Sequence, residues 1–385
     1  MSTEIILGVD FGTTFSTAAA VIGGKFHYAL DDRGESCVPS VVHFPKAGPP
    51  VVGAEAERLR ARDPENTVFG IKRVIGRPID SPQARVLNAS ALFHLDGRGG
   101  GEVKVKTRAG AMQASEVAAI IIRYLKERAQ QRFGKTIHKA VVTVPVAATP
   151  DVREAMARVG RMAGLEVVRV IAEPVAGALA RGIAGANDQG QPRLVFDFGG
   201  GTLDVTVVQR VGKTVRVLSA TGDDCLGGDD FDVAFARWVA RRVWASHAVD
   251  ITRDAILVDA VQRQCEAVKR ALSAANSARY FIPDALGGAG RTSPIDIQVS
   301  RLDLRPEWAD LVSRAVEVTR AAVTQARLSN ADLHLVSMIG GTAYVPQVRE
   351  AIGHHLGRPL DVEIDPQTAV ARGAALLAAM PGLLT

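Results

Sequence analysis

Asp10-Phe11-Gly12-Thr13-Thr14 and Asp197-Phe198-Gly199-Gly200-Gly201-Thr202 are two copies of one sequence motif, and this repeat decides the fold. Apolar residues precede each copy and also follow it. Each unit therefore predicts a strand, a glycine turn and a second strand, with an aspartate where the first strand ends. Glycine allows a sharp turn because it has no Cβ, and it brings bare backbone N–H groups close to a ligand.

Both copies carry residues suited to a metal–phosphate site. Backbone N–H groups in such turns are good phosphate donors. Asp10 and Asp197 supply carboxylate oxygens suited to Mg²⁺, which reaches proteins through few carboxylates and several waters. One such hairpin alone is most often only a turn. Two copies, each with Asp before and Thr after the glycines, predict two jaws that close on one metal–polyphosphate.

The length and composition favour a two-lobed protein. A chain of 385 residues exceeds a single compact core, and a hydrophobic content of 47% is enough to fill two. The start, 1–4, lacks the basic region of a signal peptide, and no apolar run is long enough to span a bilayer. Cys37, Cys225 and Cys265 are scattered, as free thiols in a reducing compartment would be. We therefore expect a cytoplasmic protein without a membrane partner.

The charges argue against a nucleic-acid partner. The net charge of +5 is small for this length, and basic and acidic residues are interspersed. The richest basic group, Arg237 with Arg241 and Arg242 beside Trp238 and Trp244, has helical spacing. It predicts a solvated helix face over a tryptophan-lined core. The eight histidines show no metal-ligand spacing, so no zinc site is expected.

The rest of the chain repeats one plan in each half. Apolar residues at helical spacing predict a helix over 114–133, and Thr149 followed by Pro150 predicts the N-cap of another. The same signals predict strands at 140–144, 166–171, 333–339 and 361–364, helices at 174–185, 230–244 and 255–276 and from 306, 346 and 366, and a glycine-rich loop at 287–290. Duplicated α/β lobes predict a ligand cleft between them, at the carboxyl ends of the strands.

Five segments together resemble the actin–hexokinase–heat-shock ATPase superfamily: the two hairpins, 171–178 (IAEPVAGA), 337–342 (SMIGGT) and 365–375 (DPQTAVARGAA). Within it, the chain resembles the nucleotide-binding domain of the seventy-kilodalton heat-shock chaperones. The segments with this closer similarity are 66–77 (NTVFGIKRVIGR), 140–145 (AVVTVP), 226–232 (LGGDDFD) and 266–273 (EAVKRALS). The resemblance covers essentially the whole chain.

The resemblance implies an α/β, duplicated actin-like ATPase fold: two lobes, each with a mixed sheet and an inserted subdomain, and a nucleotide cleft between them. Lobe I is expected over 1–186 with its insert at about 40–113, and lobe II over 187–361 with its insert at about 228–305. The C-terminal helix region, 362–385, is expected to return to lobe I. The implied ligands are ATP or ADP and Mg²⁺, with K⁺ as a further candidate.

The resemblance also assigns roles to single residues. Lys72 corresponds to the family lysine beside the γ-phosphate, and Asp204 would orient a metal-bound water. Asp10, Asp197 and Glu173 would hold Mg²⁺ largely through water, and Glu173 would also sense lobe closure. The implied catalytic residues are Lys72, Glu173, Asp197, Asp10, Thr202 and Asp204. The implied nucleotide-binding residues are Gly12, Thr13, Thr14, Gly199, Gly200, Gly201, Thr202, Gly228, Glu266, Lys269, Arg270, Ser273, Gly340, Gly341 and Tyr344.

Two places depart from the family pattern. Tyr344 stands where the family usually carries an arginine over adenine, so it either stacks on the base or packs at the start of the next helix. The stretch 146–151 replaces a Tyr/Phe-Asn-Asp sequence of the family. Pro145 and Arg153 on either side still match the family pair thought to relay the nucleotide state to a partner domain, so switching is expected to be kept.

The implied function is slow hydrolysis of ATP to ADP and phosphate, used as a conformational switch by a chaperone of the heat-shock, or stress, response. No segment of this sequence corresponds to the peptide-binding sandwich of the family, so the chain is expected to be either an excised domain or a stand-alone ATPase. The expected partners are therefore a peptide-binding domain or co-chaperone and a nucleotide-exchange factor, with the chain itself a monomer. An actin-like filament protein and a small-molecule kinase are alternatives. The chaperone-like helix at 255–277 and the Lys72 segment argue against both.

Overall fold

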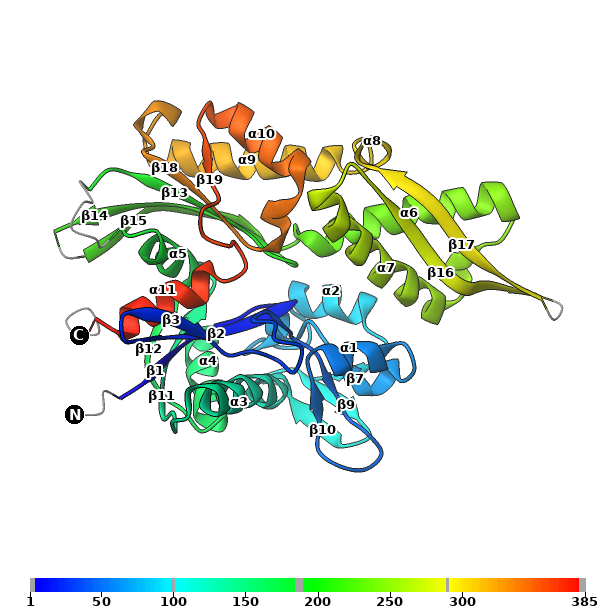
Figure 1. The fold of residues 1–385 in the computed structure, drawn as a ribbon, viewed down its shortest axis with the longest axis horizontal. Helices are drawn as coiled ribbons and strands as arrows, with labels where there is room; N and C mark the ends of the chain where they lie inside the picture. Colours follow the sequence, from blue (N-terminus) through cyan, green and yellow to red (C-terminus); the bar gives the residue numbers. More distant parts are fainter. Residues whose placement is uncertain (1–3, 98–100, 184–189, 213, 289–290, 381–385) are drawn as a thin grey trace.

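The computed structural model describes residues 4–97, 101–183, 190–212, 214–288 and 291–380 of the chain. These residues form two lobes, which lie one above the other in Figure 1. Several predicted features fall outside the described residues: the first residues of the chain (1–3), the end of the helix near 185, the boundary between the lobes at 186–187, the tip of the glycine-rich loop at 289–290 and the end of the C-terminal region at 381–385.

Each lobe is built on a mixed sheet, and the two sheets have the same strand order. The lobe I sheet runs β12-β11-β1-β2-β3, with β4 also paired to β2, and the lobe II sheet runs β19-β18-β13-β14-β15. In each, a hairpin (β1–β2 or β13–β14) is antiparallel, and two parallel strands continue the sheet beyond its first strand. The predicted duplication is therefore confirmed in the topology.

The strand bounds in lobe I are β1 (Ile6–Phe11), β2 (Phe15–Ile22), β3 (Lys25–Tyr28), β4 (Val38–Pro39), β11 (Lys139–Val144) and β12 (Glu166–Ala172). Those in lobe II are β13 (Arg193–Phe198), β14 (Leu203–Val211), β15 (Thr214–Asp223), β18 (Leu335–Ile339) and β19 (Leu360–Asp361). Both first strands, β1 and β13, lie inside their sheets and are almost continuously apolar, as expected for strands buried on both faces.

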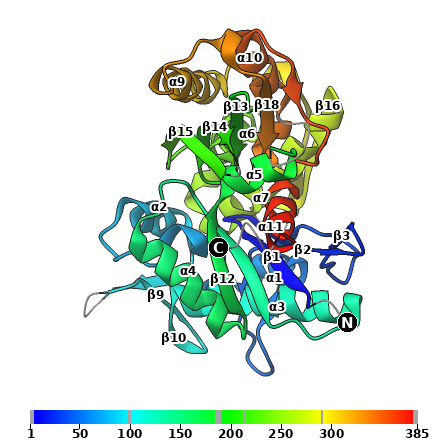
Figure 2. The same cartoon turned by 90° about the vertical axis from the view of Figure 1, so that its left-hand side faces the viewer.

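Helices cover both faces of each sheet. In lobe I, α3 (Ala114–Phe133) and α4 (Pro150–Met162) pack on the outer face, and in lobe II α9 (Ala309–Gln325) and α10 (Pro346–Leu356) do so. Between the two sheets lie α5 (Glu173–Ala180) and α11 (Ala369–Ala378), as Figure 2 shows. The central core they form joins the lobes, and α11 packs on β1, β2 and β11 of lobe I.

The two central helices approach so closely that glycine is required. A Cβ on Gly373 of α11 would lie 1.7 Å from the carbonyl oxygen of Ala176 in α5. A Cβ on Gly8 of β1 would lie 2.3 Å from the backbone nitrogen of Ala375. Because these neighbours are backbone atoms, they cannot move aside as a side chain would. The chain from lobe II thus returns to lobe I through a tight, glycine-dependent contact.

Two inserted subdomains extend the lobes on the same side and face each other (Figure 1). The lobe I insert contains a small sheet of β5 (Val42–His43), β6 (Val51–Val52) and β7 (Thr67–Val68), another of β8 (His94–Asp96), β9 (Lys104–Thr107) and β10 (Gly110–Gln113), the helices α1 (Ala54–Arg60) and α2 (Pro82–Ser90), and the 3₁₀ turns η1 (Pro64–Asn66) and η2 (Ile71–Val74). The lobe II insert contains α6 (Gly228–His247), η3 (Ile251–Arg253), α7 (Ala255–Ala274), the hairpin β16 (Ser277–Gly288) and β17 (Arg291–Ser300), and α8 (Arg301–Leu304).

Several predicted boundaries are confirmed. The helix predicted over 114–133 has those bounds. Thr149 caps α4, since its hydroxyl accepts a hydrogen bond from the backbone N–H of Val152 (3.4 Å), with Pro150 at the first position. The helix predicted at 255–276 is α7, which starts at Ala255 as predicted and ends at Ala274; its N-cap is Asp254, whose carboxylate accepts from two backbone N–H groups.

Other predicted boundaries are wrong. The helix expected over 174–185 ends at Ala180, because Gly182 adopts a left-handed conformation (φ 75°) and its N–H bonds to Leu179. The strand expected at 361–364 pairs over only two residues, in β19. The helix expected from 366 begins at Ala369, since a turn closed by Thr368 N–H on Asp365 precedes it.

Two further sequence-based predictions need correction. The helix expected from Pro306 starts at Ala309, because Trp308 N–H first closes a turn on Leu304 and its indole N–H bonds to Phe231. The prediction of a tryptophan-lined core is confirmed for one of its two tryptophans and wrong for the other. Trp238 is buried beneath Arg242, whereas Trp244 is 60% exposed.

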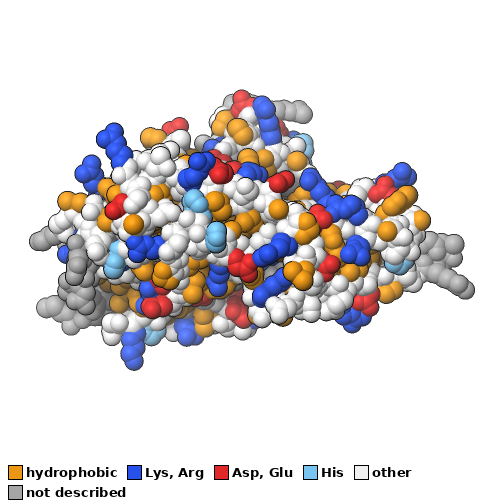
Figure 3. Space-filling model, turned by 90° about the horizontal axis from the view of Figure 1, so that it is seen from above, with side chains coloured by type: hydrophobic (Ala, Val, Ile, Leu, Met, Phe, Trp, Pro, Cys, Tyr) orange, Lys and Arg blue, Asp and Glu red, His pale blue; other side chains and the backbone are white. Residues whose placement is uncertain are grey.

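Charged residues of both signs are interspersed on the face seen in Figure 3, as the composition indicates. Arg305 and Glu350 form an exposed ion pair between the turn before α9 and α10. Among the described residues, no helix is both long and apolar enough to cross a membrane.

Candidate functional site

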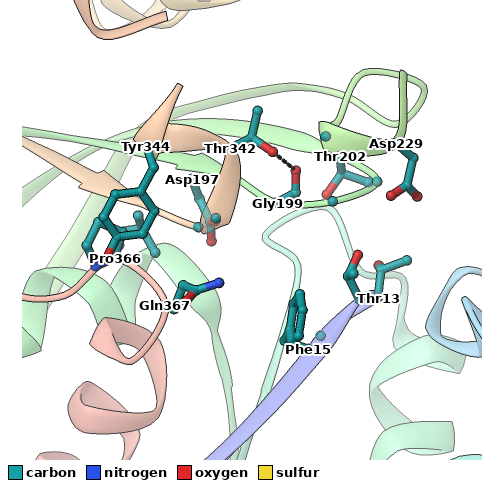
Figure 4. A pocket seen from close by; sticks show the side chains of 18 of the residues that line it. Thr13, Phe15, Asp197, Gly199, Thr202, Asp229, Thr342, Tyr344, Pro366 and Gln367 are labelled. Carbon is teal, nitrogen blue, oxygen red and sulfur yellow. Dashed lines mark hydrogen bonds between the residues drawn. The ribbon is translucent and has the colours of Figure 1, made fainter. Parts of the chain in front are cut away.

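A cavity of about 320 Å³ lies between the lobes, where the two glycine hairpins meet (Figure 4). Every residue that the sequence analysis assigns to catalysis or nucleotide binding lines it, with the exception of Asp204. The lining residues that the sequence analysis missed are Phe15, Asp229, Asp232, Ile339, Thr342, Val345, Pro366, Gln367 and Val370. The structure therefore brings together residues from both halves of the chain.

The two hairpins touch each other across the cavity. A Cβ on Gly200 of the second hairpin would lie 1.9 Å from the hydroxyl oxygen of Thr14 in the first. In the first hairpin, a Cβ on Gly12 would lie 2.0 Å from the carbonyl oxygen of Phe15. Glycine at these positions thus serves two purposes: Gly12 permits the turn itself, and Gly200 permits the close approach of the two turns.

Each hairpin is held by hydrogen bonds to its surroundings. In the first, the hydroxyl of Ser40 donates to Gly12 O (2.8 Å). In the second, Gly199 O accepts from the Thr342 hydroxyl (2.7 Å, dashed in Figure 4) and from the backbone N–H of Gly228 (3.0 Å). These bonds fix the backbone of both turns beside the cavity.

The aspartates that end β1 and β13 are deeply buried. The pKa of Asp10 is raised to about 7, chiefly by burial; Lys72 opposes the shift, and the carboxylate of Glu173 adds to it. Burial and the neighbouring carboxylate of Glu173 also raise the pKa of Asp197 well above its ordinary value. The one side-chain donor to Asp10 among the described residues is Thr143 (3.2 Å). The site is therefore short of positive charge, as a cation-binding site would be.

Lys72 and Glu173 form an ion pair at the cavity wall. Lys72 Nζ lies 2.7 Å from Glu173 Oε1, and η2 and the first turn of α5 place the two side chains there. Burial alone would lower the pKa of Lys72, but the carboxylates of Glu173 and Asp10 raise it above its ordinary value. The side chain of Lys72 is only 13% exposed, so this lysine is not a surface residue.

Asp204 does not line the cavity. It lies opposite Asp197 in the β13–β14 ladder and is buried. Burial raises its pKa to about 7, and the carboxylates of Glu173 and Asp224 contribute. Asp204 therefore belongs to the same acidic group without reaching the cavity surface in this structure.

One face of α7 lines the cavity, as the spacing of Glu266, Lys269, Arg270 and Ser273 implies. Lys269 is buried, and its ammonium donates to Gly228 O (2.7 Å) and to Asp232 (2.6 Å). Burial opposes its charge, but the carboxylates of Asp232 and Glu266 raise the pKa of Lys269. The guanidinium of Arg270 lies 5.1 Å from the ring centre of Phe15, so these two residues stack across the cleft.

Tyr344 lines the cavity while its hydroxyl is held at the wall. The hydroxyl donates to Asp365 Oδ1 (2.5 Å), and the Arg349 guanidinium lies 5.1 Å from the ring centre. The same Asp365 oxygen accepts from the backbone N–H of Gln367, whose side chain points into the cavity in Figure 4. The departure from the family arginine thus creates an aromatic wall with a fixed orientation.

The altered stretch between Pro145 and Arg153 makes its own internal contact. Arg153 Nε, in the first turn of α4, donates to the carbonyl oxygen of Ala148 (3.3 Å), and the backbone N–H of Ala148 closes a turn on Pro145 O (3.1 Å). The two residues expected to relay the nucleotide state therefore flank a closed turn at the end of β11.

Some missed residues had a signal in the sequence. Thr342 completes the Gly-Gly-Thr triplet, and Gln367 lies in the segment that follows Asp365. Phe15 had none, because its role depends on the approach of Arg270 from the other lobe.

The comparisons with known proteins agree with this geometry. The sequence profile of the family described as "Hsp70 protein" matches residues 6–382. The chain is 31% identical over 376 residues to "Chaperone protein DnaK" of Stenotrophomonas maltophilia, covering 96% of this chain and 59% of that protein. It is 34% identical over 382 residues to "Heat shock 70 kDa protein BIP3" of Oryza sativa subsp. japonica, covering 98% and 56%. The chain thus spans a little more than half the length of these curated relatives.

The family match covers both hairpins, the Lys72 segment, α7 and the segment leading into α11, and the duplicated fold is the one expected of this family. From its sequence and its fold, the chain belongs to the Hsp70 family of heat-shock chaperone proteins.

Proposed function

We propose that the chain is an ATPase domain that binds Mg-ATP between its lobes and hydrolyses it slowly to ADP and phosphate. The observation that carries this proposal is the contact of the two glycine hairpins, Gly200 against Thr14, in a cavity that the Lys72–Glu173 pair also lines. Membership of the Hsp70 family favours this function over a filament protein or a small-molecule kinase.

The residues at the phosphate end suit phosphoryl transfer to water. This reaction depends on positioning and on charge neutralisation, because the transferred group carries its charge on several oxygens. Lys72 provides a fixed cation, kept protonated by Glu173 and Asp10. Thr13 and Thr202, which both line the cavity, supply hydroxyl donors for phosphate oxygens.

The donor set fits Mg²⁺ held largely through water. Asp10, Asp197 and Glu173 would hold the ion, since their carboxylates supply the hard oxygen atoms that it prefers. Among the described residues, no three His, Cys, Asp or Glu side chains converge closely enough to bind a metal directly. A bound Mg²⁺ would supply positive charge to the phosphates and to the carboxylates of Asp10 and Asp197, whose pKa values are raised chiefly by burial. K⁺ is proposed as a further cation without assigned ligands.

The proposed cellular role is that of a nucleotide-driven switch, a monomer in the cytoplasm that serves the stress response. A peptide-binding domain or co-chaperone and a nucleotide-exchange factor are its proposed partners. The lobes would be 1–186 and 187–361, with 362–385 returning to lobe I. Because only the γ-phosphate distinguishes ATP from ADP, it must favour one lobe arrangement. Identical hydrogen-exchange patterns with ATP and ADP would refute the switch.

Phosphate release tests the ATPase proposal. In single-turnover assays with excess protein, we expect slow conversion of ATP to ADP and phosphate that requires Mg²⁺. Phosphate release no faster than in the protein-free control, with Mg²⁺ present and ATP bound, would contradict it.

A further inference from the structure

Arg73, the residue after Lys72, reaches across the cleft to the second hairpin. Its Nη1 donates to the carbonyl oxygen of Gly201 (3.1 Å), and its Nη2 donates to Asp229 Oδ2 (2.9 Å). The side chain of Arg73 is nine-tenths buried, with 9% of its surface exposed. Arg73 comes from η2 of lobe I, whereas both acceptors belong to lobe II. None of the roles proposed above uses this residue.

The two acceptors are parts of one structure around the hairpin. The backbone N–H of Asp229 donates to Gly200 O (2.8 Å), so Asp229 and Gly201 are already linked through the turn. The planar fork of an arginine can serve two such acceptors at once, which a lysine cannot. The contact is also close: a Cβ on Gly201 would lie 2.3 Å from Arg73 Nη2.

The electrostatics give Arg73 a second effect. The carboxylate of Asp229 lines the same cavity as the two hairpins, and its side chain is half exposed. Without the guanidinium beside it, this negative charge would face the phosphates uncompensated. Hydrogen bonds between two charged groups, such as that between Arg73 and Asp229, are stronger than bonds between neutral groups.

We propose that Arg73 is a positioning residue for the polyphosphate: it fixes the second hairpin against lobe I and neutralises Asp229. This inference rests on the proposed nucleotide site. Arg73 acts through the hairpin, so its effect depends on the phosphates of the ligand. Binding of the β- and γ-phosphates would require the second hairpin to be held in place against lobe I, whereas the adenosine part would contact the other end of the cavity.

A ligand series tests the proposal. The variant Arg73→Ala is titrated with ADP and ATP, and adenosine is measured by competition against ADP so that weak binding is still resolved. We expect ADP and ATP affinity to fall about tenfold or more, as loss of a charged hydrogen bond predicts, with adenosine affinity unchanged. Arg161→Ala removes an exposed arginine that forms an ion pair with Glu154 of its own helix; it is the control and should leave the affinities for ADP, ATP and adenosine unchanged.

Two further variants separate positioning from a general loss of structure. Arg73→Lys keeps the positive charge but loses the planar guanidinium that donates to two acceptors. Its ADP affinity should therefore lie between those of Arg73→Ala and the unmodified protein. Adding Asp229→Asn to Arg73→Ala should also recover part of it, because the unpaired charge is removed.

The role of Arg73 would be overturned by any of three results: an equal loss of affinity for adenosine and ADP in Arg73→Ala, an unchanged ADP affinity in this variant, or no recovery of ADP affinity in either of the two further variants. Failure of the unmodified protein to bind any nucleotide would instead refute the nucleotide site itself.

Discussion

The two glycine hairpins are alike in sequence but differ in what holds them. The first is supported within its own lobe. Ser40 donates to the carbonyl oxygens of Gly12 and Thr14, and the hydroxyl of Thr143 donates to the carboxylate of Asp10. The second has partners from several elements: Thr342 and Gly228 in lobe II, and Arg73 across the cleft. The difference indicates that the first hairpin is a fixed jaw, whereas the position of the second depends on how the lobes meet.

The largest expected effect comes from Lys72, which lies in the same lobe as the first hairpin. Lys72→Ala should lower the single-turnover rate of ATP hydrolysis about a hundredfold or more, because a preorganised charge beside the phosphates is lost. Nucleotide binding should remain largely intact. Lys126→Ala, which removes a lysine bonded to Gly164 O on the exposed side of α3, is the control. A near-normal rate in Lys72→Ala would remove this lysine from catalysis.

Alanine substitutions at one glycine of each hairpin should affect stability and ATP binding differently. Gly12→Ala places its Cβ 2.0 Å from a backbone oxygen of the same turn, so it should lower the melting temperature of the nucleotide-free protein. Gly200→Ala instead meets the hydroxyl of Thr14 in the opposite jaw, 1.9 Å away. It should leave the melting temperature nearly unchanged and weaken ATP binding about tenfold. Combining it with Thr14→Ala should restore part of the affinity, and equal effects of both glycine variants on stability would contradict the distinction.

The acidic group at the base of the jaws should make stability depend on pH. Asp10 has its pKa raised from 3.8 to about 7, so the folded protein binds more protons there than the unfolded chain does. Its contribution to stability is fully present below pH 4 and is lost as the pH rises through about 7. Asp204, with a pKa of about 7, adds to the same trend. The free energy of unfolding without nucleotide, measured from pH 5 to 8, should therefore fall, and less steeply in Asp10→Asn. An unchanged slope in this variant would exclude Asp10 as a source.

The smallest expected effect is at the far end of the cavity. Tyr344→Ala should weaken ATP binding about fivefold, the factor that about 1 kcal/mol of base stacking gives. Tyr344→Phe keeps the ring and loses only the hydroxyl bond to Asp365, so its ATP affinity should stay normal. Unchanged affinity in Tyr344→Ala, together with a lower melting temperature, would make this tyrosine a packing residue.

The sequence predicts best what depends on short segments. The repeated Asp and glycine pattern is enough to predict two hairpins, and the family segments together with the hairpins predict about two thirds of the residues that line the cavity. The contacts of Arg73 and Phe15 could not be predicted, because each joins segments from different lobes. Asp204 was expected at the cavity, but its place in the ladder opposite Asp197 leaves it off the surface. Short strands such as β19 were misjudged because pairing with β18, and not local composition, sets their ends.

Calorimetric titration with ATP, with and without Mg²⁺, tests the central claim most directly, since both jaws should contribute to one binding event. We expect one ATP bound per chain in both conditions and tighter binding with Mg²⁺, because the buried carboxylates of Asp10 and Asp197 gain a compensating charge. Absence of binding in both conditions would contradict the assignment of the cavity to a nucleotide.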